Sequence, residues 1–295
     1  MKGYRLRAGV DLGSTTAKLL IIDDSEEVQF SSYRRHGSHI IETLATLLRD
    51  AEEAIGDCPL ELSFTGSAGM GIADSIDAPF IQEVVAAGEV TRRHFPDTRV
   101  LIDIGGEDSK MIFLPPDRAP DIRMNGSCAG GTGAFIDQMA TLLNLSIKEL
   151  DELSFRHSHI HPVASRCGVF AKTDIQNLIS RKIDLPDICA SILQAVAHQN
   201  LNSLARGIAI GPKVLLCGGP LMFLAGLRKS FRTALNLPEE DIILPESGLF
   251  FPAWGAALAS EQDSPSATAA EWRRAIEQLS TISRTHQDRL EPLFA

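Results

Sequence analysis

The feature of this sequence that most constrains its fold is a short motif that occurs twice. Residues 10–14 read VDLGS and residues 102–106 read IDIGG, so in each copy an apolar segment leads into Asp, one apolar residue and Gly. A second apolar segment follows each copy at once, as expected for two strands joined by a tight turn. Self-similarity of this kind indicates a chain built from two related parts. We therefore expect an α/β protein with two similar lobes.

Apolar periodicity predicts the elements that surround the two motifs. A domain division follows from them: a first lobe at residues 1–100, a second at 101–260, and a polar tail at 261–295 that could link to further domains. We expect strands at residues 5–11, 17–23, 28–33, 60–64, 99–104, 110–114 and 213–216, helices at 40–55, 80–94, 134–143, 169–179 and 186–207, and a closing segment at 253–260.

Composition excludes several classes of function. Hydrophobic residues make up 44% and charged residues 22% of the 295 residues, and no apolar run approaches the roughly 20 residues that a membrane span needs. The net charge is −10, without a Lys/Arg run interleaved with aromatics, which argues against nucleic-acid binding. The N-terminus lacks an apolar signal core, and the five cysteines are odd in number and widely spaced. We therefore expect a cytoplasmic protein with reduced thiols rather than disulfides.

The first motif is a candidate phosphate loop. Residues 11–16 (DLGSTT) offer backbone N–H groups, hydroxyls and a glycine that permits close approach of a phosphate. Neither a GxxxxGK[ST] loop nor a GxGxxG loop after a strand occurs, so those two nucleotide-binding motifs are excluded. One such turn alone is more typical of an ordinary hairpin, but two matched copies favour phosphate binding. The candidate phosphate contacts in the first copy are Gly13, Ser14, Thr15, Thr16 and Lys18, although strand alternation could instead point Lys18 to solvent.

Two further positions are candidates for nucleotide chemistry. The Gly218-Gly219 pair follows an apolar strand, where a side chain would obstruct a ligand, and an ordinary turn before a helix is the alternative. Glu107 and Asp108 follow the second motif and could orient an attacking water, or could form a solvated turn.

Residues 9–23, 102–112 and 214–220 resemble the two phosphate motifs and the adenosine motif of the acetate and sugar kinase, Hsp70 and actin superfamily. The resemblance extends over nearly the whole chain to residue 260. It implies an actin/hexokinase/Hsp70-like fold, in which two ribonuclease-H-like lobes enclose an ATP cleft. It also implies that Asp11 and Asp103 face the Mg²⁺-bound phosphates, with Gly105 and Gly106 in the second phosphate loop.

Two cysteines stand where a kinase would not need them. Cys128 precedes a glycine-rich loop and a helix (NGSCAGGTGAFIDQMA), and Cys167 precedes another helical pattern (SRCGVFAKTDIQNLI). A helix N-terminus favours thiolate, as a metal–thiolate site requires. Two thiols are half of what an iron–sulfur cluster usually takes, and a two-fold homodimer would supply the other half. The alternative is a buried apolar role, which we expect for Cys58, Cys189 and Cys217.

These two segments resemble the activator (component A) of 2-hydroxyacyl-CoA dehydratases and the ATPase subunits of benzoyl-CoA reductase, which are ATPases of the BadF/BadG/BcrA/BcrD type. The resemblance implies that Cys128 and Cys167 of two subunits hold one 4Fe–4S cluster. It implies further that ATP hydrolysis passes a low-potential electron from reduced ferredoxin or flavodoxin to a CoA-thioester dehydratase or reductase, which could be part of the same longer polypeptide. One departure is Glu107, where the activators commonly have Gln. The nucleotide-binding residues implied beside the cluster are Gly130, Gly131, Thr132 and Gly133.

Two other functions remain open. A small-molecule kinase of the same superfamily, of the N-acetylglucosamine kinase type, would need a sugar cleft and a base, and would leave the two cysteines without a task. A non-redox regulatory module could use the ATPase only to switch shape. A cluster of His157, His159 and His161 suggests a metal, but its alternate spacing in a polar segment is more typical of a solvated loop.

Overall fold

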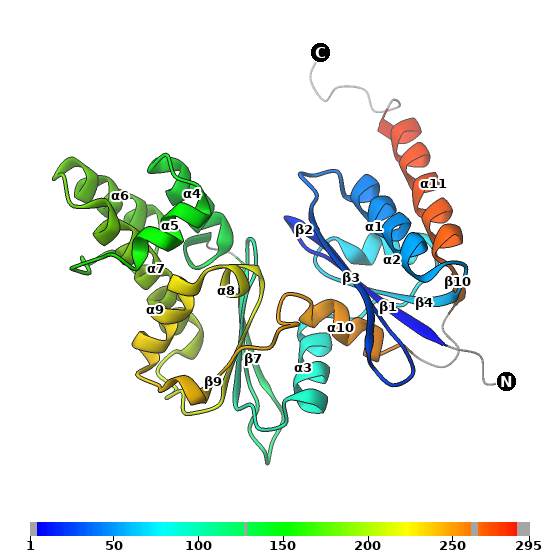
Figure 1. Cartoon of the computed structure of the whole chain (residues 1–295), viewed down its shortest axis with the longest axis horizontal. Coiled ribbons are helices and arrows are strands. Elements are labelled where there is room, and N and C mark those ends of the chain that lie inside the picture. The colour runs from blue at the N-terminus through cyan, green and yellow to red at the C-terminus, as the bar shows by residue number, and fades with distance from the viewer. Residues whose placement is uncertain (1–4, 127–128, 261–264, 288–295) are drawn as a thin grey trace. The chain divides into compact units, whose positions relative to one another are not determined.

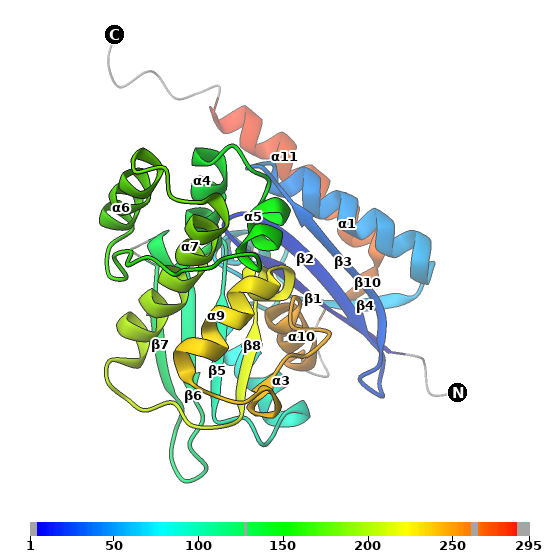
Figure 2. The ribbon, with the colours of Figure 1, turned by 60° about the vertical axis from the view of Figure 1, so that its left-hand side comes forward.

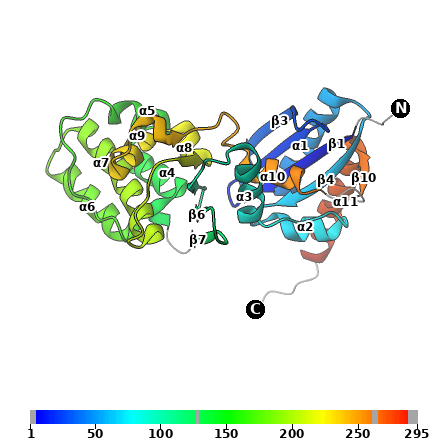
Figure 3. The same ribbon diagram turned by 90° about the horizontal axis from the view of Figure 1, so that it is seen from below.

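The computed structural model describes residues 5–126, 129–260 and 265–287, and the chain divides into two compact units (Figure 1). Unit 1 comprises Met1–Val90 and Phe250–Ala295, and unit 2 comprises Thr91–Leu249. These boundaries differ from the expected division at residues 100 and 260. The reason is that the chain returns to the first unit with α10 (Phe251–Leu258), which packs against β1 (Figure 3).

Unit 1 contains a five-stranded mixed sheet in the order β10-β4-β1-β2-β3. β1 pairs antiparallel with β2 and parallel with β4, as expected when a hairpin is followed by a helical crossover. β10 pairs antiparallel with β4 at the sheet edge. The strands are β1 (Leu6–Leu12), β2 (Thr16–Ile22), β3 (Val28–Arg35), β4 (Pro59–Thr65) and β10 (Ser266–Thr268).

Unit 2 repeats this topology with the order β7-β6-β5-β8-β9. β5 pairs antiparallel with β6 and parallel with β8, so the predicted duplication of the α/β lobe is confirmed. The last strand differs, because β9 pairs parallel with β8 whereas β10 pairs antiparallel with β4. The strands are β5 (Val100–Ile104), β6 (Ser109–Phe113), β7 (Asp121–Asn125), β8 (Val214–Cys217) and β9 (Ile242–Ile243).

In unit 1, one sheet face packs on α1 (Ile40–Ile55) and α11 (Ala269–Gln287), which lie side by side (Figures 1 and 2). Alternation along the strands sends Val10 and Leu12 of β1, and Leu62 of β4, into this core, and leaves Asp11 on the face toward α10. The remaining helices of this part of the chain are α2 (Gly69–Ser75) and α3 (Glu83–His94).

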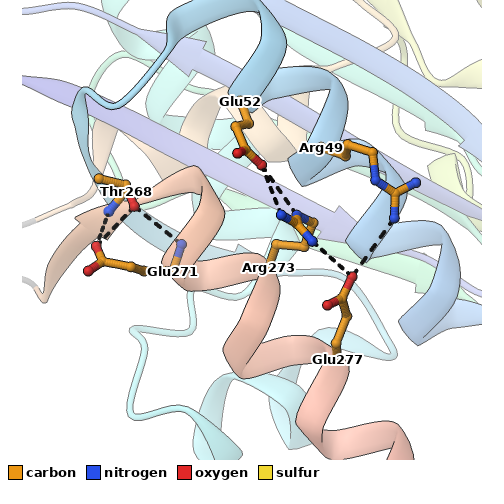
Figure 4. Close-up of polar contacts among 6 residues, drawn as sticks. All are labelled: Arg49, Glu52, Thr268, Glu271, Arg273 and Glu277. Carbon is orange, nitrogen blue, oxygen red and sulfur yellow. Dashed lines mark hydrogen bonds and ion pairs between the residues drawn. The ribbon is translucent and has the colours of Figure 1, made fainter.

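The C-terminal segment is part of unit 1 rather than a separate polar tail (Figure 4). Trp272 of α11 is buried and donates from its indole nitrogen to Leu60 O at 2.9 Å. Arg273 bonds Glu52 of α1 at 3.2 Å and Glu277 at 3.3 Å. The few apolar residues of α11 lie along one face of the helix, among polar residues. Burial of this face against the core of unit 1 fixes α11 to the unit.

Unit 2 is mostly helical around α7 (Leu185–Asn200), which runs beside α9 (Ala225–Leu235) (Figure 2). The expected helix at 186–207 instead ends at Asn200 and continues as one π-turn, Leu201–Ala205. The additional helices are α4 (Gly133–Leu142), α5 (Ile147–Ser154), α6 (Gly168–Ser180) and α8 (Gly219–Phe223), with 3₁₀ turns at Ala129–Gly131 and Glu239–Asp241. Across the described residues, none of the helices combines the length and the apolar character that a bilayer crossing requires.

Candidate active site

The two motifs form matching hairpins, one in each unit. Hairpin 1 (residues 11–18) closes where Gly13 N–H donates to Thr16 O at 2.9 Å, and hairpin 2 (residues 103–110) closes where Gly105 N–H donates to Asp108 O at 2.9 Å. In each hairpin the aspartate is the register partner of a lysine: Asp11 pairs with Lys18, and Asp103 pairs with Lys110. The same backbone device therefore presents an Asp and a Lys side by side in both units.

Hairpin 1 contains a buried carboxylate, and one of its two oxygens accepts no hydrogen bond from the described residues. Asp11 is 2% exposed, and its Oδ2 accepts a hydrogen bond from Lys18 Nζ at 2.7 Å. Lys18 thus points to the aspartate, not to solvent. Within the described chain, no group donates to Asp11 Oδ1. A buried anionic oxygen without a partner is costly, and a hydrated divalent cation would satisfy it, so this aspartate fits a Mg²⁺ site. Ser14 is exposed, and Gly13, Thr15 and Thr16 are partly exposed.

In hairpin 2 the lysine forms an ion pair with an aspartate on the turn. Lys110 is buried, and its Nζ lies 2.7 Å from Asp108 Oδ2, while Asp103 is 5% exposed. A Cβ atom at Gly105 would lie 2.2 Å from Asp108 Oδ1, so the glycine lets this carboxylate fold back over the turn. Asp108 is therefore a fixed residue, whereas Glu107 is exposed on the turn.

A glycine lies close to the carboxylate of each of these two aspartates, Asp11 and Asp103. Gly66 follows β4 and Gly218 follows β8, with φ of +94° and +89°, which favour glycine. A Cβ atom would lie 2.6 Å from Asp11 Oδ1 at Gly66 and 2.3 Å from Asp103 Oδ1 at Gly218. Gly218 was predicted from the sequence and Gly66 was not, although each directly follows a strand that is parallel to the one carrying the aspartate. Gly219 differs, because the nearest described atoms would lie 4.0 Å from its Cβ.

The candidate nucleotide-binding residues of unit 2 converge on the glycine loop (residues 129–133). Gly133 N–H donates to Gly105 O at 3.0 Å, and the next residue, Ala134, donates to Gly106 O at 2.7 Å. A Cβ atom at Gly133 would lie 3.0 Å from Cγ of Pro220, directly after the Gly218-Gly219 pair. Hairpin 2, the glycine loop and residues 218–220 are therefore neighbours in space.

Two buried polar contacts fix the shape of the glycine loop. Thr132 is fully buried, and its hydroxyl donates to Ala129 O at 2.7 Å. Asn200 of α7 donates from Nδ2 to Gly131 O at 2.7 Å. The loop is thus held in one conformation by its own threonine and by the end of α7.

The other end of the glycine loop touches the start of α6. Cys128 lies outside the described residues, but Gly130 and Gly168 pack so tightly that a Cβ on Gly130 would lie 2.9 Å from Cα of Gly168. Cys167 is the residue before α6 and is partly exposed. The segments that follow the two cysteines are therefore in contact.

The surface beside Cys167 is apolar. Val169 and Phe170, in the first turn of α6, are 73% and 67% exposed. Within the described part of the chain, no group of three or more Cys, His, Asp or Glu side chains could hold a metal ion. The thiol of Cys167 is therefore partly exposed beside an exposed apolar surface.

The other three described cysteines and the segment that contains His157, His159 and His161 have structural roles. Cys189 and Cys217 are buried, burial raises the pKa of Cys189 to about 11, and Cys58 packs partly buried against the core of unit 1. The histidine segment is anchored by Asp187, whose Oδ1 accepts the backbone N–H groups of Ser158 at 2.7 Å and His159 at 3.1 Å. These N–H donors lower the pKa of Asp187. This segment is therefore a loop tied to α7.

One residue of hairpin 1's surroundings was missed by the sequence analysis. His36 is buried at the end of β3, and its Nε2 lies 3.0 Å from Gly13 O. Its Nδ1 accepts the Ser38 N–H at 3.1 Å, so the ring proton is on Nε2 and is donated to Gly13 O. The backbone N–H of His36 donates to Thr15 O at 3.2 Å. His36 thus holds the turn of hairpin 1 at two carbonyls.

The duplicated sheets and their matching hairpins define an α/β fold of the actin, hexokinase and Hsp70 type. Within that class, the chain belongs to the BadF/BadG/BcrA/BcrD ATPase family, whose model matches residues 8–260.

Named relatives are similar along most of their length. The 2-hydroxyisocaproyl-CoA dehydratase activator of Clostridioides difficile is 30% identical over 257 residues, which are 85% of this chain and 92% of that protein. The crystal structure of the Acidaminococcus fermentans (R)-2-hydroxyglutaryl-CoA dehydratase component A gives a TM-score of 0.75 at 26% identity, covering 93% of this chain and 99% of that one. The Clostridium difficile activator with bound ADPNP gives 0.71 at 27% identity, covering 99% and 100%.

Proposed function

We propose that this chain is an ATP-hydrolysing iron–sulfur activator that transfers a low-potential electron to a 2-hydroxyacyl-CoA dehydratase or a related CoA-thioester reductase. The names of its relatives support the activator role, and the ADPNP-bound relative supports ATP and ADP as ligands. Reduced ferredoxin or flavodoxin is the proposed electron donor, and the cytoplasm is the proposed location.

The observation that carries this proposal is the position of the glycine loop. Gly133 bonds hairpin 2, which is a candidate phosphate loop, and Gly130 packs on Gly168 beside Cys167. A shift of hairpin 2 on ATP hydrolysis would therefore reach the cysteine segments within a few residues. Tightly packed contacts of this kind transmit small displacements because they have little room to absorb them.

The ATPase part rests on charge placement. Asp11 and Asp103 would hold Mg²⁺, which neutralises phosphate charge when bound. Lys18 forms an ion pair with Asp11, and Lys110 forms one with Asp108, so each hairpin carries a positive charge beside a carboxylate. The proposed phosphate contacts are Gly13, Ser14, Thr15, Thr16, Lys18, Gly105 and Gly106, with Gly130, Gly131, Thr132, Gly133, Gly218 and Gly219 for the rest of the nucleotide and Glu107 and Asp108 to orient water.

The redox part requires a second copy of the chain. Cys128 and Cys167 are two thiols, and a 4Fe–4S cluster usually takes four, so a two-fold homodimer would complete the set. The exposed Val169 and Phe170 beside Cys167 support this arrangement, because a dimer would cover them. When bound, the cluster supplies a site that stores and releases one electron.

The test is iron and sulfide analysis with EPR spectroscopy of the protein purified without oxygen, together with its mass in solution. Cys128→Ser and Cys167→Ser should each abolish iron binding. Cys189→Ser is the matched control, since that thiol is buried in the core, and it should retain iron. A complete cluster in a chain that stays monomeric, or undiminished iron in both key variants, would defeat the proposal. Absence of iron together with phosphorylation of an amino sugar would favour the kinase alternative.

A further inference from the structure

Two buried oxygens on neighbouring strands of unit 1 have no hydrogen-bond partner among the described residues. Thr65 ends β4 and is the register partner of Asp11 in the parallel β1/β4 pair. Thr65 is fully buried, and within the described chain its hydroxyl has no hydrogen-bond partner, like Asp11 Oδ1. Register partners in adjacent strands point to the same face, so the hydroxyl and the carboxylate lie on the face away from α1 and α11.

A buried hydroxyl without a partner destabilises the folded protein, so its presence calls for a ligand or water. The matching position in unit 2 is Cys217, the register partner of Asp103, and a thiol is only a weak hydrogen-bonding group. Of these two matching positions, only the one in unit 1 therefore carries a hydroxyl. In that unit, Oδ1 of Asp11 has no hydrogen-bond donor among the described residues.

The described surroundings supply no side chain that competes with a ligand for that oxygen. Lys18 occupies Oδ2 of Asp11, and Gly66, directly after Thr65, has no side chain that would cover Oδ1. Mg²⁺ in proteins binds one or two carboxylates and keeps several of its waters, which need hydrogen-bonding partners of their own.

We propose that Thr65 is a positioning residue for Mg-ATP, whose hydroxyl binds the hydration shell of the magnesium ion held at Asp11 Oδ1. The inference rests on the proposed ATPase function and adds to it a second-strand contact for the cation. Residues that orient a metal's ligands from outside typically contribute about 10- to 100-fold in metal affinity.

The experiment compares Thr65→Val, which keeps the shape but removes the hydroxyl, with Thr65→Ser, which keeps the hydroxyl. Ser63→Ala is the matched control: Ser63 lies on the same face of β4 and is equally buried, and its hydroxyl has no partner among the described residues, but its register partner is Gly9. Binding of a fluorescent ADP analogue is titrated with Mg²⁺, and the thermal midpoint is measured without Mg²⁺ and nucleotide.

We expect Thr65→Val to raise the half-saturating Mg²⁺ concentration about 10-fold or more, with an unchanged or higher thermal midpoint, since a methyl replaces an unpaired buried hydroxyl. Thr65→Ser should stay near wild type, as should Ser63→Ala. Unchanged Mg²⁺ dependence in Thr65→Val, or an equal shift in Ser63→Ala, would overturn the inference. Asp11→Asn is titrated in parallel. If Asp11→Asn loses the Mg²⁺ dependence and Thr65→Val keeps it, Thr65 has no such role and the ATPase proposal stands. If both variants keep the Mg²⁺ dependence, the proposed magnesium site itself fails.

Discussion

Lys18 donates a 2.7 Å hydrogen bond to Asp11, and Lys110, at the matching position of hairpin 2, forms a 2.7 Å ion pair with Asp108. The two hairpins share backbone geometry, and in both of them the lysine pairs with a carboxylate of its own hairpin. In hairpin 1 the lysine neutralises the strand-end aspartate itself. In hairpin 2 the lysine also holds the carboxylate of Asp108 on the turn.

Asp11→Asn and Asp103→Asn should each lower ATPase turnover about 100-fold or more, because a charge that positions a phosphoryl-transfer site is lost while the shape is kept. Steady-state phosphate release measures the effect, and circular dichroism checks the fold. Asp24→Asn, at an exposed position after β2, is the control and should behave as wild type. Near-normal turnover in both site variants would remove the two aspartates from the mechanism.

The two glycines after β8 should respond differently to substitution. At Gly219 the structure leaves room, so Gly219→Val should fold normally and weaken ATP binding on the order of 10- to 100-fold, since the added atoms fill space proposed for the nucleotide. Gly218→Ala should instead destabilise the fold, because φ is +89° and the Cβ would lie 2.2 Å from Ile104 O. Thermal melts and nucleotide titrations separate the two effects. Wild-type affinity in folded Gly219→Val would identify the pair as a turn alone.

Burial raises the pKa of the Cys189 thiol from 9.0 to about 11, so at about pH 8 only about one molecule in a thousand carries the reactive thiolate. Iodoacetamide should therefore modify partly exposed Cys167 in the native, iron-free protein long before Cys189. The raised pKa also means that stability is retained below pH 9 and falls as the pH rises toward 11. Peptide mass spectrometry follows the labelling, and denatured protein, in which both thiols react, is the control. Equal native rates at the two cysteines would contradict the burial argument.

Local patterns predicted both hairpins, the glycine pair and five helices of the described chain, α1, α3, α4, α6 and α7, because each is encoded within a short stretch of sequence. The helix α5 was not predicted although Ser146 and Glu149 form a capping box, because its apolar stripe is short. The role of α11 was missed because Trp272 and Ile276 become core only through packing on distant strands and α1. Gly66 was not selected because nothing in its local sequence shows that it stands over Asp11.

His36 lies 23 residues after Gly13 in the chain, and its contact arises only when β3 returns beside β2. His36→Ala removes the ring contact to Gly13 O but keeps the backbone bond to Thr15 O, so it should loosen the turn of hairpin 1 without touching the nucleotide itself. We expect the KM for Mg-ATP to rise about 10-fold, with a smaller change in kcat, and hydrogen exchange of residues 13–16 to accelerate.

His36→Gln keeps an N–H donor on a side chain of similar reach and should restore part of the affinity for ATP. His39→Ala is the matched control, because His39 is exposed just before α1 and makes no side-chain capping bond. A purely structural role would lower the thermal midpoint of His36→Ala and leave KM unchanged. A raised KM with faster exchange confined to hairpin 1 would instead identify His36 as the residue that keeps the phosphate loop in its binding conformation.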